Sequence, residues 1–170
     1  MLSDIHSAYE TRRNKLPVIA AFITVFIAMV FMMVYVRDAK SQQPVVSLWE
    51  HSSNPQRGMS LMRMNQLDNR VEIVYDVPRT SLLDIGIRPG HLLFQGVRND
   101  GIFIGNAFVF ACGQSWPYRV TGYFTDGRLR LQGPAPIIER DAYGDRCYVA
   151  RTSYTDRNAN LLFWFRGMVQ

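Results

Sequence analysis

The chain contains residue types that could support catalysis, but their spacing matches no catalytic motif. Carboxylates for general acid–base chemistry occur at Asp76, Asp84, Asp126 and Glu139, and no two of them have the spacing of a catalytic pair. Most of them stand at expected turns, where aspartate accepts backbone hydrogen bonds. These four carboxylates define one hypothesis, a membrane-tethered hydrolase or transferase that acts on glycans or peptides of the cell envelope.

The sequence also has few residues that could support histidine-dependent catalysis or bind a metal. Outside the N-terminal tail the only histidines are His51 and His91, and the pattern of His, Cys and carboxylates is not typical of a metal site. The run Glu50-His51-Ser52-Ser53 could supply a nucleophile and its base, but adjacent residues on a strand point to opposite faces, and this run has the composition of a loop. We therefore expect no metal, no cofactor and no catalytic residue.

Cys112 and Cys147 are the only cysteines of the chain. An isolated pair in a small domain predicts a disulfide in an oxidising compartment, and the alternative is two buried free thiols. A disulfide that closes a loop of about 35 residues would stabilise the domain by about 3–4 kcal/mol.

Aromatic residues and arginines give better evidence for a binding site. From Ser41 onward every basic residue is one of 14 arginines, a pattern that fits anion recognition and also fits a GC-rich genome that encodes Arg in place of Lys. A second layer formed by the segment Val45 to Leu67 could instead cover the aromatic residues. The candidate surface for a sugar or a peptide consists of Tyr123, Tyr148, Tyr154, Trp164, Arg119, Arg130 and Arg166.

Net charge gives little support for nucleic-acid binding. The chain carries a formal charge of +5, but its basic residues are dispersed and acidic residues lie between them. Nucleic-acid-binding domains gather their basic residues on one face or along one stripe. We therefore expect no nucleic-acid partner.

A hydrophobic period of two dominates the chain from Arg70 onward and predicts β-strands. Asn99-Asp100-Gly101 and Thr125-Asp126-Gly127 are hairpin signals, because these residues tolerate positive φ. Met59, Met62 and Met64 do not follow the strand period well and are interpreted as gap-filling core or a loop flap. The last two strands should form a hairpin. The expected strands are 71–76, 91–97, 102–112, 118–124, 128–132, 147–154 and 161–166, with a further one near 46–49 and a helical turn within 80–86.

These elements predict a mainly β fold for an extracytoplasmic domain at residues 45–170. Short strands joined by tight turns favour a small antiparallel meander of about seven or eight strands. The pattern leaves two architectures open, a closed barrel and a sandwich.

The run Leu16 to Val36 predicts one transmembrane helix in front of this domain. Its 21 residues carry no charge, and as a helix they would span about 30 Å, the thickness of the hydrocarbon core of a bilayer. A cleaved signal peptide is the alternative, but such peptides have a shorter apolar stretch and a small-residue cleavage site, which the sequence lacks. Residues 1–15 would form a short cytoplasmic tail and residues 37–44 a linker. The predicted location is the inner membrane, with the C-terminal domain in the periplasm.

Four short stretches resemble a known group of proteins. They run from Gly90 to Gly96, Gly105 to Phe110, Pro117 to Gly122 and Leu131 to Pro136, with the cysteine pair beside them. The chain resembles small extracytoplasmic β-rich proteins of rhizobia-like α-proteobacteria, over about residues 70–165. That group has no assigned activity, so the resemblance implies a fold and a compartment and assigns no catalytic residue.

The leading functional prediction is a single-pass membrane protein with a non-catalytic periplasmic β-domain. Such a domain would act as a binding or assembly module of the cell envelope. Its expected partners are the lipid bilayer, through Leu16 to Val36, and an envelope glycan or protein. Two alternatives remain, the carboxylate-dependent envelope hydrolase or transferase and a small subunit of a secretion or conjugation apparatus.

Overall fold

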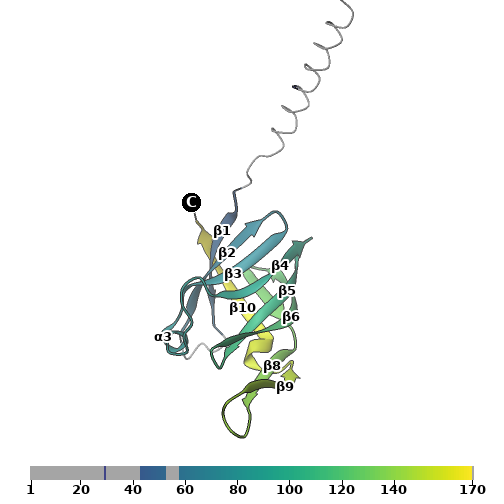
Figure 1. Cartoon of the computed structure of the whole chain (residues 1–170). Helices are drawn as coiled ribbons and strands as arrows, with labels where there is room; N and C mark the ends of the chain where they lie inside the picture. The colour runs from purple at the N-terminus through teal and green to yellow at the C-terminus, as the bar shows by residue number, and fades with distance from the viewer. Residues whose placement is uncertain (1–28, 30–42, 53–57, 170) are drawn as a thin grey trace, which may run out of the picture. The chain divides into compact units, whose positions relative to one another are not determined.

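Eight antiparallel strands close into a barrel in the order β1-β10-β7-β6-β5-β4-β3-β2 (Figure 1). This computed structural model describes Met29, residues 43–52 and residues 58–169. It confirms the mainly β prediction and decides for the barrel over the sandwich. The barrel strands are β1 (Val45–His51), β2 (Ser60–Leu67), β3 (Arg70–Val77), β4 (Leu92–Asn99), β5 (Ile102–Ala111), β6 (Gln114–Thr125), β7 (Arg128–Gln132) and β10 (Asn160–Met168).

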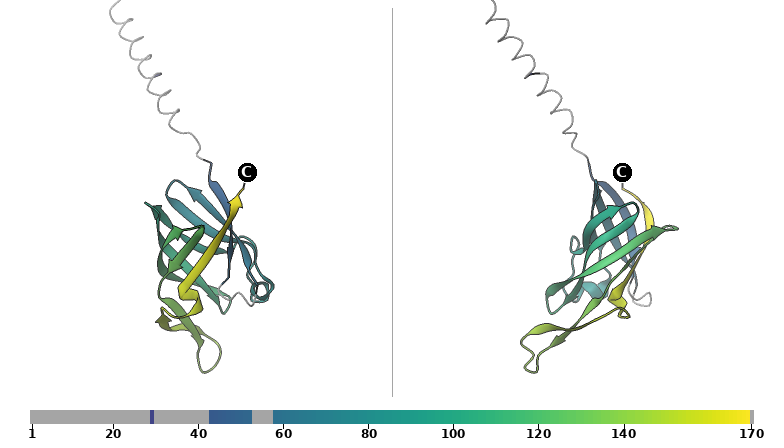
Figure 2. Two further views of the ribbon diagram at one scale, coloured as in Figure 1. Left: turned by 180° about the vertical axis from the view of Figure 1, so that it is seen from behind. Right: turned by 90° about the vertical axis from the view of Figure 1, so that its right-hand side faces the viewer.

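The barrel is an up-and-down meander that β10 closes by pairing with both β7 and β1. The turns β2–β3, β4–β5 and β6–β7 lie at one end, which we call the hairpin end. The opposite end carries the short helix α3 (Thr80–Leu83), the β5–β6 turn and the 3-10 helix η2 (Arg157–Ala159), and we call it the α3 end. Figure 2 shows both ends from two further sides.

Aspartates with positive φ make the three turns of the hairpin end. Asp68, Asp100 and Asp126 have φ values of 53°, 48° and 51°. A short polar side chain tolerates this left-handed conformation better than a bulky one, and glycine follows in two of the three turns. Both predicted hairpins, at Asn99-Asp100-Gly101 and Thr125-Asp126-Gly127, are confirmed.

Side chains fill the interior of the barrel, as expected for eight strands. The alternation of β7 shows the rule, because Leu129 and Leu131 are fully buried while Arg128 and Arg130 face outward. The other large side chains that are fully buried include Met62, Ile73, Phe94 and Phe163.

Glycines allow the strands β4, β5 and β6 to approach each other closely. Gly96 faces Gly105 across the β4–β5 pair, and a Cβ on Gly105 would lie 2.2 Å from the backbone oxygen of Gln95. A Cβ on Gly122 would lie 1.9 Å from the backbone oxygen of Arg130. No side chain fits at such distances, so these positions require glycine for close backbone approach.

The interpretation of Met62 and Met64 as core residues is confirmed, because both are buried inside the barrel. The expectation that they do not follow the strand period was wrong, because both belong to strand β2, in which the alternating residues Leu61 and Arg63 are only partly buried. The period of two is therefore present. Polar residues on the outer face and flexible methionines on the inner face made it hard to recognise from the sequence.

The predicted hairpin between the last two strands is also wrong. Strand β9 (Cys147–Ser153) pairs with β8 (Ala135–Arg140), which is absent from the expected strands, and the two form a separate sheet that projects from the α3 end (Figure 1). The reason is polarity. Every residue of β9 is at least partly exposed, whereas β10 carries the buried Leu161 and Phe163 that complete the barrel.

Cys112 and Cys147 form the predicted disulfide, with Cα atoms 6.5 Å apart. Cys112 lies in the β5–β6 turn, one residue beyond the end of β5, and Cys147 is the first residue of β9. The bond therefore ties the β8–β9 hairpin to the α3 end of the barrel.

The predicted membrane helix, Leu16 to Val36, lies outside the described residues except for Met29, as do the tail 1–15 and most of the linker 37–44. Within the described part of the chain, no helix has the length and apolar character needed to cross a bilayer.

Candidate functional site

A shallow hollow of about 560 Å³ lies on the outer surface of the barrel over β6, β7 and β10. We call it the outer groove. Tyr123 and Trp164 contribute aromatic rings, and Arg128 and Arg130 contribute guanidinium groups. Tyr123 is 54% exposed. The groove is lined by Ser52, Tyr123, Thr125, Asp126, Arg128, Arg130, Asn160, Leu162 and Trp164.

Strand register explains why these residue types meet. Tyr123 on β6 pairs with Arg130 on β7, so the ring and the guanidinium group stand side by side. One step along the same face, Arg128 pairs with Trp164 on β10. Directly paired residues on one face have Cβ atoms about 5 Å apart. The two strand pairs therefore place one arginine beside each aromatic ring.

Hydrogen bonds position part of the groove. Arg130 Nη2 donates to Asn160 Oδ1 over 3.2 Å, and Gln132 Nε2 donates to the same oxygen. Asp126 is the one acidic residue in the lining, against two arginines. The groove therefore combines a net positive charge with an exposed phenol ring and a half-buried indole ring, which suits an anionic ligand that has an apolar face.

A second hollow, of about 680 Å³, adjoins the outer groove and shares Trp164 with it. It contains Arg166, whose Nη2 lies 2.5 Å from Glu50 Oε2. The hydrogen bond to Glu50 raises the pKa of Arg166 above its usual range. Because its guanidinium group is already paired, Arg166 offers less to a ligand than Arg128 or Arg130.

The predicted surface residues do not form one site. Tyr123, Arg130 and Trp164 meet in the outer groove, and Arg166 lies beside it. Arg119 is exposed on β6 but pairs with Asn106 of β5, away from the groove. Tyr148 and Tyr154 lie on the β8–β9 hairpin and in the loop after it.

Sequence reasoning missed Arg128, although the alternation that places Arg130 outside places Arg128 there too. The expectation that a second layer covers the aromatic residues is wrong. Within Val45 to Leu67, residues 45–51 and 60–67 are the barrel strands β1 and β2 themselves. Strand β1 pairs with β10 and β2, and β2 pairs with β3, so both strands belong to the barrel wall and do not form a layer over it.

The four carboxylates of the enzyme hypothesis are dispersed. Asp76 lies near the end of β3 and is 3.8 Å from Arg63 Nη1, and Asp84 follows α3. Asp126 is in the β6–β7 turn at the opposite end of the barrel, and Glu139 is on β8. Among the hollows described here, Asp126 is the single one of the four that lines any.

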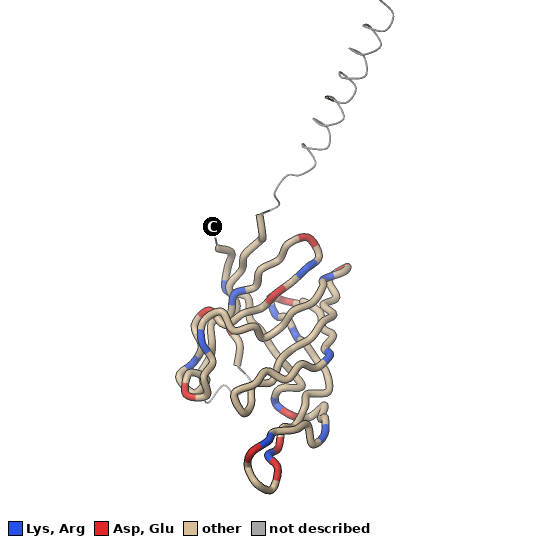
Figure 3. Tube along the Cα trace, viewed as in Figure 1, with Lys and Arg blue, Asp and Glu red and all other residues tan. Residues whose placement is uncertain are grey.

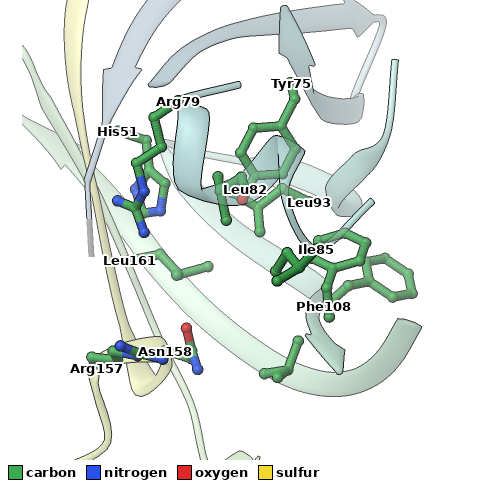
Figure 4. Close-up of a pocket in the computed structure, with 12 residues that line it drawn as sticks. His51, Tyr75, Arg79, Leu82, Ile85, Leu93, Phe108, Arg157, Asn158 and Leu161 are labelled. Atoms are coloured by element: carbon green, nitrogen blue, oxygen red, sulfur yellow. The ribbon is translucent and has the colours of Figure 1, made fainter. Parts of the chain in front are cut away.

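A small cavity of about 90 Å³ lies at the α3 end, and no sequence signal pointed to it (Figure 4). We call it the α3-end cavity. Its lining comes from β1, β3, β4, β5, η2, β10 and the α3 segment, so no local motif records it. The lining residues are His51, Tyr75, Arg79, Leu82, Ile85, Leu93, Phe108, Val109, Phe110, Arg157, Asn158 and Leu161.

His51 was expected in a loop, but it is the last residue of β1 and points inward. Its Nδ1 donates to the backbone oxygen of Leu162 over 2.9 Å, and its ring stacks on Phe163. Burial lowers the pKa of His51 to about 4; the hydrogen bond to Leu162 opposes this shift, and the charge of Arg79 adds to it. The imidazole is therefore neutral near pH 7.

Two tyrosines are buried at the same end. Burial raises the pKa of Tyr75 to about 12, and the nearby Arg79 opposes the shift. Burial also raises the pKa of Tyr118, whose hydroxyl donates to the backbone oxygen of Asn158. Both phenols are therefore neutral hydrogen-bond donors under ordinary conditions.

Charges of both signs alternate over the described surface, with acidic and basic residues close together in the loop of the β8–β9 hairpin (Figure 3). In the described ranges, no three His, Cys, Asp or Glu side chains are placed to hold a metal ion. Comparison of the chain with protein-family models, curated proteins and solved structures finds no match.

Proposed function

We propose that this protein is a membrane-anchored binding module of the cell envelope, and that its outer groove binds an acidic glycan. The observation that carries the proposal is the pairing of Tyr123 with Arg130 and of Arg128 with Trp164 across three strands. An exposed indole or phenol ring packs on the apolar face of a sugar ring. A guanidinium group binds a sugar carboxylate through two parallel hydrogen bonds.

The filled barrel favours a binding surface over a deep active site. Large apolar side chains occupy the interior, and the four carboxylates of the enzyme hypothesis do not converge. The outer groove, in contrast, has the size of an ordinary ligand site, about 300–1,000 Å³. Its openness to solvent suits a long polymer that lies along the barrel surface.

The membrane anchor and the compartment rest on the sequence and on the cysteines. The apolar run Leu16 to Val36 is long enough to hold the domain at a bilayer. The Cys112–Cys147 disulfide is of a kind that persists in oxidising compartments such as the bacterial periplasm. Maleimide labelling of intact cells and of lysates, with and without reductant, tests both points. Free cysteines that react only after lysis, without reductant, would contradict the periplasmic location.

Binding is tested with the full-length chain in a neutral detergent, using a galacturonic acid hexamer and maltohexaose as probes. We expect saturable binding of the acidic hexamer, weakened by salt because exposed charges are screened, and no binding of the neutral one. The double variant Arg128→Gln/Arg130→Gln and the variant Trp164→Ala should each lower the affinity about tenfold or more.

Matched controls are Arg119→Gln and Tyr148→Ala, which remove an arginine and an aromatic ring outside the groove. Equal losses in groove and control variants would rule out the groove as the site. An acidic peptide that competes better than the hexamer would assign the groove to a protein partner. Recovery of shortened hexamer after incubation would favour the hydrolase alternative.

A further inference from the structure

The α3-end cavity has one polar wall and one apolar wall. Figure 4 shows the side chains of Arg79, His51, Arg157 and Asn158 on one side of the view. The opposite side is apolar, and it is formed by Leu82, Ile85, Leu93 and Phe108. A cavity with this division fits a ligand that has a polar head and a short apolar body.

Two polar groups that line this cavity have no hydrogen-bond partner among the described residues. Tyr75 is 4% exposed, and its hydroxyl makes none of the hydrogen bonds of the described residues. The Nη2 group of Arg79 is also without a partner in the described part of the chain, since the bonds of this guanidinium group are made by Nε and Nη1. Among the described residues, the fully buried side-chain atom without a partner is Arg63 Nε, which is not part of this cavity. The Tyr75 hydroxyl and Arg79 Nη2 are therefore free to donate to a ligand in the cavity.

The charge of the cavity is positive and uncompensated. Arg79 Nε donates to Ser81 Oγ over 3.1 Å, and its Nη1 donates to Ser52 Oγ and to the backbone oxygen of Gly58. The ion pairs of the described residues, Arg63–Asp76 and Arg166–Glu50, do not involve it. No acidic residue lines the cavity. A half-buried guanidinium group without a carboxylate favours an anion beside it.

Size limits the ligand. A cavity of about 90 Å³ has about three times the volume of one water in the liquid and is smaller than the cavity of about 150 Å³ that binds benzene, so it admits only a small ligand. A monocarboxylate with four carbons has six non-hydrogen atoms, two of which are the carboxylate oxygens. A longer chain would have to displace the side chains of the apolar wall.

We infer that the α3-end cavity binds a short-chain monocarboxylate, whose carboxylate accepts hydrogen bonds from Arg79 and Tyr75 and whose tail lies on Leu82 and Leu93. This site is separate from the outer groove and does not depend on the proposed function. A bound carboxylate would also fix the α3 segment to the barrel, because Arg79 opens that segment and Tyr75 belongs to β3.

The test uses the full-length chain in a neutral detergent with acetate, butyrate and octanoate as probes. We expect butyrate to shift the imidazole NMR signals of His51 saturably and to raise the unfolding temperature, while the His6 signals stay in place. Acetate should bind several-fold more weakly than butyrate because it lacks the apolar tail. Octanoate should also bind more weakly than butyrate, because its chain is too long for the cavity. Butan-1-ol and butylammonium, which lack the carboxylate, should give no saturable shift.

The variants Arg79→Gln and Tyr75→Phe each remove one proposed polar contact with the carboxylate, and they test whether that contact contributes to the affinity. Arg79→Gln should lower butyrate affinity at least tenfold and Tyr75→Phe several-fold, whereas Arg88→Gln, which changes an exposed arginine of the same segment, should leave it unchanged. If Arg79→Gln fails to fold, Tyr75→Phe and the chain-length series decide alone. Shifts that chloride or butan-1-ol reproduces, or affinity that both cavity variants retain, would overturn the assignment.

Discussion

The side chain of His51 shows how burial decides the chemistry of a single residue. In the folded protein its ring is 5% exposed, and its Nδ1–H is bonded to Leu162. Burial removes the water that would stabilise a protonated imidazole, and the charge of Arg79 disfavours that form further, so the pKa of His51 falls to about 4. The residue is therefore a neutral hydrogen-bond donor near neutral pH.

This burial predicts an acid-sensitive stability. The unfolded chain protonates His51 near pH 6.5, whereas the folded chain does so near pH 4. The contribution of neutral His51 is complete above pH 6.5, and it is lost as the pH falls toward 4. The loss in the free energy of unfolding should approach about 3 kcal/mol. Urea unfolding of the full-length chain in neutral detergent, between pH 7 and pH 4, measures it.

The variant His51→Gln keeps a donor for Leu162 but does not titrate. We expect it to be less stable than wild type at pH 7 and to lose less stability between pH 6.5 and pH 4. His91→Gln removes an exposed histidine and is the matched control, so its acid loss should equal that of wild type. If His51→Gln and wild type lose the same free energy over this range, another group carries the effect.

At the scale of elements, the barrel depends on close approach of β4, β5 and β6. Gly105→Ala would place a Cβ 2.2 Å from the backbone oxygen of Gln95 and 2.6 Å from Cα of Gly96. Backbone must move to relieve these contacts, because neither atom belongs to a flexible side chain. We expect a loss of about 3 kcal/mol or more in the free energy of unfolding, at or above the usual range for overpacking.

Gly167→Ala is the control for that variant. A Cβ at Gly167 meets nothing within 4 Å, and the residue also lies in a barrel strand. Its free energy of unfolding should stay within about 0.5 kcal/mol of wild type. Thermal or urea unfolding of both variants compares them directly, and similar losses would show that glycine flexibility and not backbone proximity matters.

At the scale of the whole molecule, the disulfide joins two units of structure that share few other contacts. The β8–β9 hairpin has its own two-stranded sheet, and a hairpin of that size is only marginally stable alone. We expect the double variant Cys112→Ser/Cys147→Ser to lose about 3–4 kcal/mol in the free energy of unfolding. Limited proteolysis should then cut first between β8 and β9, while the barrel strands stay protected. Cleavage that begins instead in the barrel would show that the disulfide supports the barrel itself.

Local patterns predicted most of the strands. The alternation of Leu and Arg in β7 can be recognised from adjacent residues in the sequence. The same holds for the turns at Asp100 and Asp126, whose residues tolerate positive φ. Where the local signal was weak, the interpretation failed. Strand β2 was missed because its inner residues are methionines, and β8 was missed because prolines and glycine precede or interrupt it.

The candidate sites show the same division. The sequence could indicate that Tyr123, Trp164 and Arg130 face away from the core, because facing depends on a period of two. It could not indicate that Tyr123 stands beside Arg130, since this depends on the register between β6 and β7. The α3-end cavity could not be predicted from local sequence patterns, because its lining residues are spread over the chain from His51 to Leu161.

By itself the sequence determined the apolar run Leu16 to Val36, the β class of the domain and two of the three hairpins of the hairpin end, because chain-local hydrophobicity and turn geometry set these features. The tertiary structure alone decided that the sheet closes into a barrel. Closure requires β10 to pair with β7 and β1 rather than with its predecessor β9. That choice depends on which strand can bury its side chains inside the barrel, and burial is a property of the whole fold.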